Sequence, residues 1–429
     1  MKRTVFSLSI LLLLTRLVSG TVLWAIPTTA DPDSSVKNSS GPDLYKNLDL
    51  FTRVIKLIRE DYVEEVSIKD LIYGAIRGMT MALDPHSVFM APEAYKELKV
   101  DTEGRFGGVG LEVTLRNNLI TVVTPIEDSP AAKAGIKEGD LILKIEGSPT
   151  KELGLDESVR LMRGSRGTRV RLIVFREGWK EPQEMTLRRD IIRIKSVRAE
   201  MPEDGLGYIR IASFQENTSG ELRRAEESLA KKSKGGLKGL ILDLRNNPGG
   251  LLDEAVRVSD MFIDSGLIVT TIGRSEEELD KREATKNGEP SYPLIVLING
   301  GSASAAEIVA GALQDHKRAV VLGTTSFGKG TVQSVFDLGD GAALKLTIAK
   351  YYTPKGRSIQ AEGIKPDIVV EARRPANFTK DRALHEKDLK GHLPSHSEKK
   401  PETLPAVADE DYQKKVALDY LRSWEVFGK

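Results

Sequence analysis

The spacing of apolar and polar positions changes twice along this chain. Leu44, Leu48, Phe51 and Val54 recur at helical spacing, and similar patterns continue to about residue 100. After Gly104 the apolar positions form short runs typical of strands, with two short helical patterns between them. From about residue 200, strand-like runs alternate with helical patterns, which predicts a sheet with helices packed on it. The sequence therefore predicts a multidomain α/β (α+β) protein.

Each change of pattern, together with stretches rich in proline, glycine or charge, predicts a boundary. Tyr412, Val416, Tyr420 and Trp424 lie at helical spacing near the end of the chain and predict a last helix. The predicted ranges are a signal peptide or N-terminal anchor at 1–30, a linker at 31–43, a helical N-terminal segment at 44–103, a small domain of short strands at 104–190, a β/α core at 191–372, a charged linker at 373–408 and a C-terminal helix at 409–429.

The first residues predict export. Lys2 and Arg3 precede an apolar run at 5–14, and cleavage is expected after Gly20 or after Ala30. Residues 5–26 are nearly long enough to cross a bilayer, so an uncleaved membrane anchor is the alternative. In both cases the bulk of the chain is exported to a periplasmic or other extracytoplasmic space. Membrane contact is expected only through this segment, if it is uncleaved.

The amino-acid composition excludes several classes of chemistry for this chain. The formal net charge is +1, which gives no indication of nucleic-acid binding. The chain has no cysteine, so disulfides, thiolate nucleophiles and cysteine metal sites are excluded. No group of His, Asp and Glu has the spacing of metal ligands. No metal or cofactor is therefore expected.

Ser304 is the first candidate for chemistry. Ser304 and Glu307 fit the S-x-x-E capping box, and the local sequence alone favours a plain helix start. A helix start also presents unpaired N–H groups and the positive end of the helix dipole, which stabilise a developing oxyanion. Ser302, two residues earlier, is the competing nucleophile.

A histidine base for this serine is not expected. The histidine near it in sequence is His316, beside Asp315. One helix over residues 304–316 would place Asp315 roughly 16 Å along the axis from Ser304, beyond hydrogen-bond reach. Asp315 is expected instead to cap or pair at the end of the helix.

Lys329 is the candidate base that remains. A lysine can deprotonate a serine only if its amine is neutral near pH 7, which requires burial. Gly328 and Gly330 flank it and permit close approach of backbone. In an extended chain Gln333 would lie on the same side and could hold the amine. An exposed loop lysine is the ordinary alternative.

Part of the same sequence also fits a different function, the binding of a nucleotide phosphate. Residues 323–329 match the first part of a phosphate-binding P-loop. The next position, Gly330, lacks the hydroxyl that would bind magnesium, and residues 331–336 alternate like a strand rather than opening a helix. A nucleotide hydrolase is therefore disfavoured.

Two glycine-containing stretches can present backbone N–H groups. Residues 246–250 (Asn-Asn-Pro-Gly-Gly) follow an apolar strand and form either a plain strand-to-helix turn or a donor to an oxyanion. Residues 107–111 (Gly-Gly-Val-Gly-Leu) form either a turn before a strand or a loop that catches a peptide carboxylate.

Taken together, the motifs resemble those of the carboxyl-terminal processing proteases, also called tail-specific proteases, over about residues 44–370. The resemblance is carried by motifs in the same order at residues 83–87, 106–110, 242–250, 301–307 and 327–333. One departure is Ala306, where many relatives have a serine. The resemblance implies that residues 104–190 are an inserted PDZ domain and that residues 191–372 are a Ser–Lys protease core.

The resemblance also implies roles for particular residues. It places the nucleophile on Ser304, the general base on Lys329 and the support of that lysine on Gln333. It assigns the oxyanion donors to the backbone N–H groups of Gly250, in preference to Gly249, and of Ala305. The residues expected to bind the substrate tail are Gly108, Val109, Gly110 and Leu111.

The expected function is that of an exported serine endopeptidase without cofactor. Its PDZ domain would recognise the C-terminal tail of a protein substrate, and the Ser304–Lys329 dyad would cleave that substrate. The alternative is a catalytically silent PDZ scaffold or adaptor. A homodimer formed through the helical N-terminal segment and the last helix is also considered.

Overall fold

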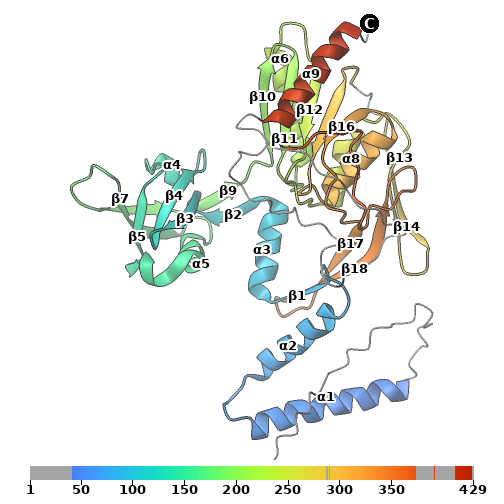
Figure 1. Cartoon of the computed structure of the whole chain (residues 1–429). Coiled ribbons are helices and arrows are strands. Elements are labelled where there is room, and N and C mark those ends of the chain that lie inside the picture. Colours follow the sequence, from blue (N-terminus) through green and yellow to red (C-terminus); the bar gives the residue numbers. More distant parts are fainter. Residues whose placement is uncertain (1–40, 287, 289, 373–390, 392–410, 428–429) are drawn as a thin grey trace, which may run out of the picture. The chain divides into compact units, whose positions relative to one another are not determined.

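The computed structural model describes residues 41–286, 288, 290–372, 391 and 411–427 (Figure 1). The expected signal or anchor at 1–30 and almost all of the charged linker at 373–408 lie outside the described residues. None of the helices in the described ranges combines the length and apolar character needed to cross a bilayer. The predicted mixture of helices and strands is confirmed, and so is the helical N-terminal segment.

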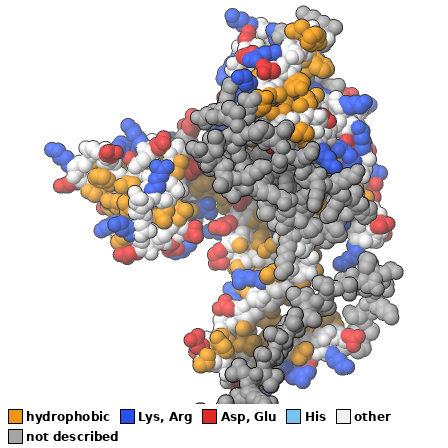
Figure 2. All heavy atoms as spheres, viewed as in Figure 1, with side chains coloured by type: hydrophobic (Ala, Val, Ile, Leu, Met, Phe, Trp, Pro, Cys, Tyr) orange, Lys and Arg blue, Asp and Glu red, His pale blue; other side chains and the backbone are white. Residues whose placement is uncertain are grey.

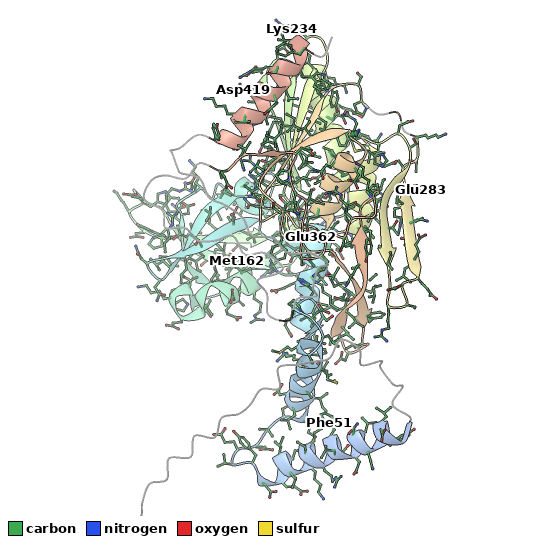
Figure 3. All side chains as sticks on the ribbon, turned by 45° about the vertical axis from the view of Figure 1, so that its right-hand side comes forward. Phe51, Met162, Lys234, Glu283, Glu362 and Asp419 are labelled. Carbon is green, nitrogen blue, oxygen red and sulfur yellow. The ribbon has the colours of Figure 1, made fainter. Side chains whose placement is uncertain are left out.

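Helix α1 (Gly41–Asp61) belongs to a unit that is separate from the rest of the described chain. Asp43 in its first turn and Arg59 in its last turn complement the helix dipole. Its apolar positions recur three or four residues apart and give the helix one apolar face. Phe51, on this helix in Figure 3, is 40% exposed, and Leu44 is 57% exposed.

The main sheet of the β/α core is mostly parallel. Its strand order is β10-β11-β12-β15-β16-β19, and every neighbouring pair is parallel except β10 and β11. Both β12 and β15 are buried along their whole length, which explains their continuous apolar sequences. The strands are β10 (Val197–Glu203), β11 (Leu206–Ile211), β12 (Gly239–Asp243), β15 (Leu294–Ile298), β16 (Ala319–Gly323) and β19 (Ile368–Val369).

Helices cover both faces of this sheet. Leu240 and Leu242 pack into a core with α6 (Thr218–Lys232), α7 (Leu252–Asp260) and α8 (Ala305–Asp315). Ile241 points to the other face, where α9 (Tyr412–Phe427) contributes Ala417 and Leu421. The predicted last helix is therefore confirmed, and it covers the face opposite α8.

A second sheet lies beside the core and includes strands that the sequence analysis did not predict. The hairpin β13–β14 and the short strand β1 were not predicted, whereas β17 lies where residues 331–336 were expected to form a strand. Strand β18 pairs with β1, β13 and β17, all antiparallel. The strands are β1 (Val88–Met90), β13 (Leu267–Ile272), β14 (Glu278–Glu283), β17 (Thr331–Asp337) and β18 (Ala343–Tyr352), and the helices on either side of β1 in sequence are α2 (Ile68–Met81) and α3 (Pro92–Glu103).

The inserted domain has its own sheet and its own apolar core. Ile120, Ile142, Val170 and Leu172 are fully buried in that core. Strands β2 (Arg105–Gly108) and β9 (Asp190–Arg193) pair with each other, so the two connections to the β/α core run side by side. The sheet consists of β3 (Leu111–Arg116), β4 (Leu119–Pro125), β5 (Leu141–Ile145), β6 (Ser148–Pro149), β7 (Arg169–Phe175) and β8 (Gln183–Arg188).

The two helices of the inserted domain lie near their expected places. Helix α4 (Pro130–Lys133) begins at Ser129, whose side chain accepts a hydrogen bond from the N–H of Ala132. Helix α5 (Thr150–Met162) is bent at Gly154, which has φ 71°, and the helical pattern of the sequence begins only beyond this bend, near Asp156. Met162 ends this helix (Figure 3). The sequence pattern showed only the part of the helix beyond this bend.

Acidic and basic side chains are interspersed over the face shown in Figure 2, with small hydrophobic clusters between them. This mixture agrees with the formal net charge of +1. Among the described residues of this one face, no extended basic stripe of the kind that binds nucleic acid is visible.

Candidate active site

Ser304 lies at the junction between strand β15 and helix α8. It is the N-cap of α8, with φ 53° and ψ −113°, a backbone conformation that is strained for a residue with a side chain. Such a conformation costs of order 1–3 kcal/mol and persists only where the surroundings impose it. A strained strand-to-helix turn is also the geometry that presents a nucleophilic serine in unrelated hydrolases. Ser304 is largely buried, at 9% exposure.

Ser302, the competing serine, has a structural position. Its hydroxyl donates to the carbonyl of Leu244 at 2.8 Å and accepts the N–H of Asn299 at 3.0 Å. The residue is fully buried. The Ser302 hydroxyl therefore holds the turn after β15 against the end of β12 and is already committed to two partners.

Glu307 connects the serine to the lysine. Its Oε2 accepts the backbone N–H groups of Ser304 at 2.8 Å and of Lys329 at 2.9 Å. Its Oε1 accepts the hydroxyl of Ser326 at 2.5 Å and the N–H of Gly328 at 2.7 Å. Full burial raises the pKa of Glu307 to about 7, against the lowering effect of these four hydrogen bonds. The capping box predicted only the contact with Ser304, because the contact with the lysine loop is not local in sequence.

Lys329 lies in the loop between β16 and β17 and is partly buried. The neighbouring glycines allow this loop to pack against the segment at 359–363. A Cβ on Gly330 would lie 2.3 Å from the backbone nitrogen of Gln360, and Gly328 has φ 96°. Residue 331 begins strand β17 rather than a helix, so the chain has no phosphate-loop architecture here.

Gln333 lies on β17, next to a bulge in the pairing of β17 with β18. Its side-chain nitrogen donates to the hydroxyls of Thr331 at 2.8 Å and Thr347 at 3.2 Å. Because both bonds engage the amide nitrogen, the amide oxygen remains as an acceptor on the other side of the group.

The turn at residues 246–250 lies against the serine. A Cβ on Gly249 would lie 2.8 Å from the Cβ of Ser304 and 3.1 Å from the nitrogen of Ala305, so this close approach requires glycine. The N–H of Gly249 donates to the side chain of Asn247 at 2.9 Å. The N–H groups of Gly250 and Ala305, in contrast, donate to no acceptor in the described part of the chain. The turn and the helix start next to Ser304 thus each contain one backbone N–H group that is available to bind a substrate oxygen.

The histidine beside Asp315 lies away from the serine. His316 is at the opposite end of α8, and its Nε2 lies 2.7 Å from the carbonyl oxygen of Leu267. Asp315 accepts hydrogen bonds from Arg357 and from the N–H of Lys355, as expected for a residue that pairs at a helix end. Among the residues that the structure describes, no group of His, Asp and Glu is placed to hold a metal ion.

The proposed tail-binding residues span the end of β2 and the start of β3. The carbonyl of Val109 accepts the N–H of Ala131 at 2.9 Å, and the carbonyl of Gly110 accepts the hydroxyl of Ser129 at 3.1 Å. In a trans peptide the N–H points opposite to the carbonyl, so the next N–H groups of this loop point away from α4.

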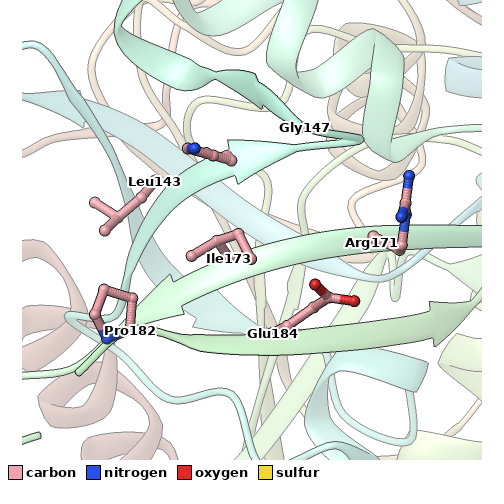
Figure 4. Close-up of a pocket in the computed structure, with 7 residues that line it drawn as sticks. Leu143, Gly147, Arg171, Ile173, Pro182 and Glu184 are labelled. Atoms are coloured by element: carbon pink, nitrogen blue, oxygen red, sulfur yellow. The ribbon is translucent and has the colours of Figure 1, made fainter.

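A hollow of about 440 Å³ lies elsewhere on the same domain (Figure 4). It is formed over strands β5, β7 and β8, and Leu143, Ile173 and Pro182 supply its apolar lining. None of the residues from 108 to 111 lines this hollow. It is therefore distinct from the loop that was expected to bind a substrate tail.

Comparisons with known proteins agree with these domains. Residues 205–370 match the model of peptidase family S41, residues 121–176 match a PDZ domain, and residues 24–94 match the N-terminal domain of the activating protease CtpB. The presence of a PDZ domain is thus confirmed.

Similar proteins extend over most of the chain. A carboxy-terminal-processing protease of Bartonella bacilliformis is 46% identical over 85% of this chain and 84% of its own length. The carboxy-terminal processing protease CtpA of Bacillus subtilis is 38% identical over 83% of this chain and 76% of its own length. A solved structure, the photosystem II D1 C-terminal processing protease, is 32% identical over 76% of this chain and 88% of its own, with a TM-score of 0.45.

The identity and the coverage of the two relatives from Bartonella bacilliformis and Bacillus subtilis establish the family that the motifs indicated. On this basis, the chain belongs to the carboxy-terminal processing proteases, which are serine-type peptidases of family S41.

Proposed function

We propose that this chain is an exported endopeptidase that captures the C-terminal tail of a protein substrate and cleaves the substrate with a Ser304–Lys329 dyad. The observation that carries the proposal is the shared contact with Glu307, whose buried carboxylate accepts the backbone N–H groups of both residues. This contact brings the strained helix start and the lysine loop to one buried group.

The reaction follows from the chemistry of the two side chains. Lys329, with a neutral amine, takes the proton of the Ser304 hydroxyl as the serine oxygen bonds to the substrate carbonyl carbon. The resulting ammonium then gives that proton to the leaving amine as the C–N bond breaks. A water molecule attacks the acyl-enzyme in the same way, with Lys329 again transferring the proton, and Ser304 is restored.

The negative charge on the substrate oxygen needs two donors. We assign this role to the N–H groups of Gly250 and Ala305, because both lack an acceptor in the described part of the chain while Gly249 is engaged with Asn247. The Ala305 N–H also lies in the first turn of α8, where the helix dipole favours negative charge. Fixed donors of this kind lower the barrier because they need no reorganisation during the reaction.

The PDZ domain supplies the recognition. The N–H groups in the loop at Gly108, Val109, Gly110 and Leu111 would bind the substrate's terminal carboxylate, and strand β3 would pair with the tail. Export through the N-terminal segment would place the enzyme outside the cytoplasm, either free or anchored to the membrane. The exposed apolar side chains of α1, including Leu44 and Phe51, favour a homodimer as a further part of the proposal.

The test uses purified protein and one protein substrate with an apolar C-terminal tail. The proposal expects fragments by mass spectrometry with the unaltered enzyme and none with Ser304→Ala or Lys329→Ala. Amidation of the substrate's C-terminus should raise KM because it removes the carboxylate. Binding of the tail without any cleavage would instead support a silent scaffold, and cleavage by Ser304→Ala would reject the nucleophile.

A further inference from the structure

The motif Leu-Asp-Pro-His-Ser at residues 83–87 has no role in the chemistry described above, yet it surrounds a buried carboxylate. Asp84 is 8% exposed and lies in the turn between α2 and β1. Its Oδ1 accepts the backbone N–H groups of His86 at 2.8 Å and Ser87 at 2.9 Å, and its Oδ2 accepts the Ser87 hydroxyl at 2.7 Å. The turn is thus built around this one side chain.

One further contact of Asp84 leaves the turn. The hydroxyl of Thr347, on strand β18, donates to Asp84 Oδ1 at 3.1 Å, and the backbone N–H of Thr347 donates to the Ser87 hydroxyl at 3.1 Å. The pairing of Val88 with Lys345 sets this register, because it lays the end of the turn beside Thr347. The motif is therefore attached to β18, the strand that pairs with the Gln333-bearing strand β17.

The direction of each hydrogen bond in this chain of contacts is determined by Asp84. Burial opposes ionisation, but the hydrogen bonds from Ser87, His86 and Thr347 hold the pKa of Asp84 below its usual range. An ionised carboxylate can only accept, so Thr347 must give its single proton to Asp84. The Thr347 oxygen can then only accept from Gln333, whose side-chain nitrogen lies 3.2 Å away. Gln333 is thereby bound through its nitrogen.

The strand geometry supports the same arrangement independently. Gln333 and Thr347 are direct partners across β17 and β18, so their side chains lie on one face of the sheet. A register shift between Val332 and Gln333 marks a bulge, a feature that re-aims a side chain next to a functional site. Thr331 accepts the second N–H of the Gln333 amide at 2.8 Å.

We infer that Asp84 is a positioning residue for the active site, which acts through Thr347 to hold the Gln333 amide with its oxygen available to the Lys329 amine. This inference rests on the proposed dyad. An amide oxygen can accept an N–H of the lysine in either charge state, whereas an amide nitrogen cannot. With the oxygen in place, the lone pair of the neutral amine is left for the Ser304 proton.

The decisive variants alter Thr347, because they remove the contact without placing a new charge. Thr347→Val should lower kcat by about tenfold or more and leave KM unchanged, since a misplaced base weakens proton transfer. It should also shift the acid limb of the pH profile of kcat. Thr347→Ser should restore most of the activity. Thr271→Val on β13 of the same sheet is the matched control and should keep kcat within about twofold.

A double-mutant cycle separates positioning from simple stability. If Asp84 and Thr347 act through Gln333, Thr347→Val should add little to the loss caused by Gln333→Ala. The inference would be overturned if the double variant lost kcat by the product of the two single losses. It would also be overturned if Thr347→Val lowered the melting temperature but left kcat and its pH profile unchanged. If Asp84→Asn folds, its kinetics should resemble those of Thr347→Val. If Asp84→Asn does not fold, the comparison of Thr347→Val with Thr347→Ser tests the inference on its own.

The inference and the proposed dyad can fail separately. Activity that survives in Lys329→Ala would reject the dyad, and the positioning role would fall with it. Loss of cleavage in Lys329→Ala together with full activity in Thr347→Val would support the dyad and reject only the positioning role of Asp84.

Discussion

The backbone N–H of Lys329 donates a 2.9 Å hydrogen bond to the buried carboxylate of Glu307. The same carboxylate oxygen accepts the N–H of Ser304 at 2.8 Å. The helix start at Ser304 and the loop at Lys329 are therefore both hydrogen-bonded to Glu307 Oε2. The distance between these two segments depends on that oxygen continuing to accept both hydrogen bonds. A group that accepts four hydrogen bonds in the interior is costly to replace, because each donor left without a partner loses its hydration without compensation.

The first prediction concerns Glu307→Gln. The amide nitrogen would face N–H or O–H donors that the carboxylate now accepts, so about 1–3 kcal/mol of stability should be lost. We expect kcat to fall more than KM changes, because the lysine loop would lose its attachment to the helix start. Urea unfolding and steady-state kinetics on a tail-bearing substrate measure the two effects. A variant with native kcat would show that this attachment is not needed for catalysis.

The second prediction is that the loss of stability in Glu307→Gln depends on pH. Glu307 has a pKa of about 7 in the folded chain against an ordinary value of 4.5, so the folded state binds the extra proton between these values. The contribution of Glu307 to stability is therefore fully present below pH 4.5 and is lost as the pH rises to about 7.

The measurement is the free energy of unfolding of the unaltered protein minus that of Glu307→Gln, taken at several pH values. It should decrease by on the order of 3 kcal/mol across this window, because each pKa unit is worth about 1.4 kcal/mol. A difference that stays constant from pH 4.5 to about 7 would mean that the pKa of Glu307 is not raised and that the group is ionised throughout this window.

The third prediction distinguishes the two serines. Ser304→Gly should abolish cleavage but raise stability by about 1 kcal/mol, because glycine accepts a positive φ without strain. Ser302→Ala should lower stability by about 1–3 kcal/mol, since the Leu244 carbonyl and the Asn299 N–H each lose a partner. Thermal unfolding and cleavage of the same substrate test both variants. An inactive but fully stable Ser302→Ala would move the nucleophile to Ser302.

The fourth prediction concerns the attachment of α9. Arg245, which follows β12 and precedes the turn at 246–250, binds Asp411 through both terminal nitrogens at 2.7 Å and binds Asp243 as well. Asp411→Ala should therefore lower stability by about 1 kcal/mol, at the low end for a charged hydrogen bond because its side chain is 44% exposed.

The control lies on α9 itself. Asp419, labelled in Figure 3, pairs with Arg422 on the exposed surface, and Asp419→Ala should change stability by less than about 0.5 kcal/mol. Urea unfolding of the two variants makes the comparison. Equal losses would show that the contact with Arg245 contributes no more than a surface pair.

Much of the fold could be predicted because its signals are local. The apolar runs of β12 and β15 and the helical pattern of α8 are visible in short windows of sequence. Strand β14 (Glu278–Glu283) was missed because it is a charged edge strand without an apolar pattern, whereas the sequence of its partner β13 carries a clear apolar run. Its position depends on pairing with β13, which local spacing does not show.

For the candidate site, the sequence by itself determined the order of the short motifs that contain Ser304, Lys329, Gln333 and the glycine turns. Their proposed roles come from the resemblance of these motifs to a known family, because residue type and spacing alone left a plain helix start and a loop lysine as alternatives. Only the tertiary structure decided how these motifs are connected. The buried Glu307 and Asp84 act on partners far along the chain, and such hydrogen bonds arise only when folding brings distant segments together.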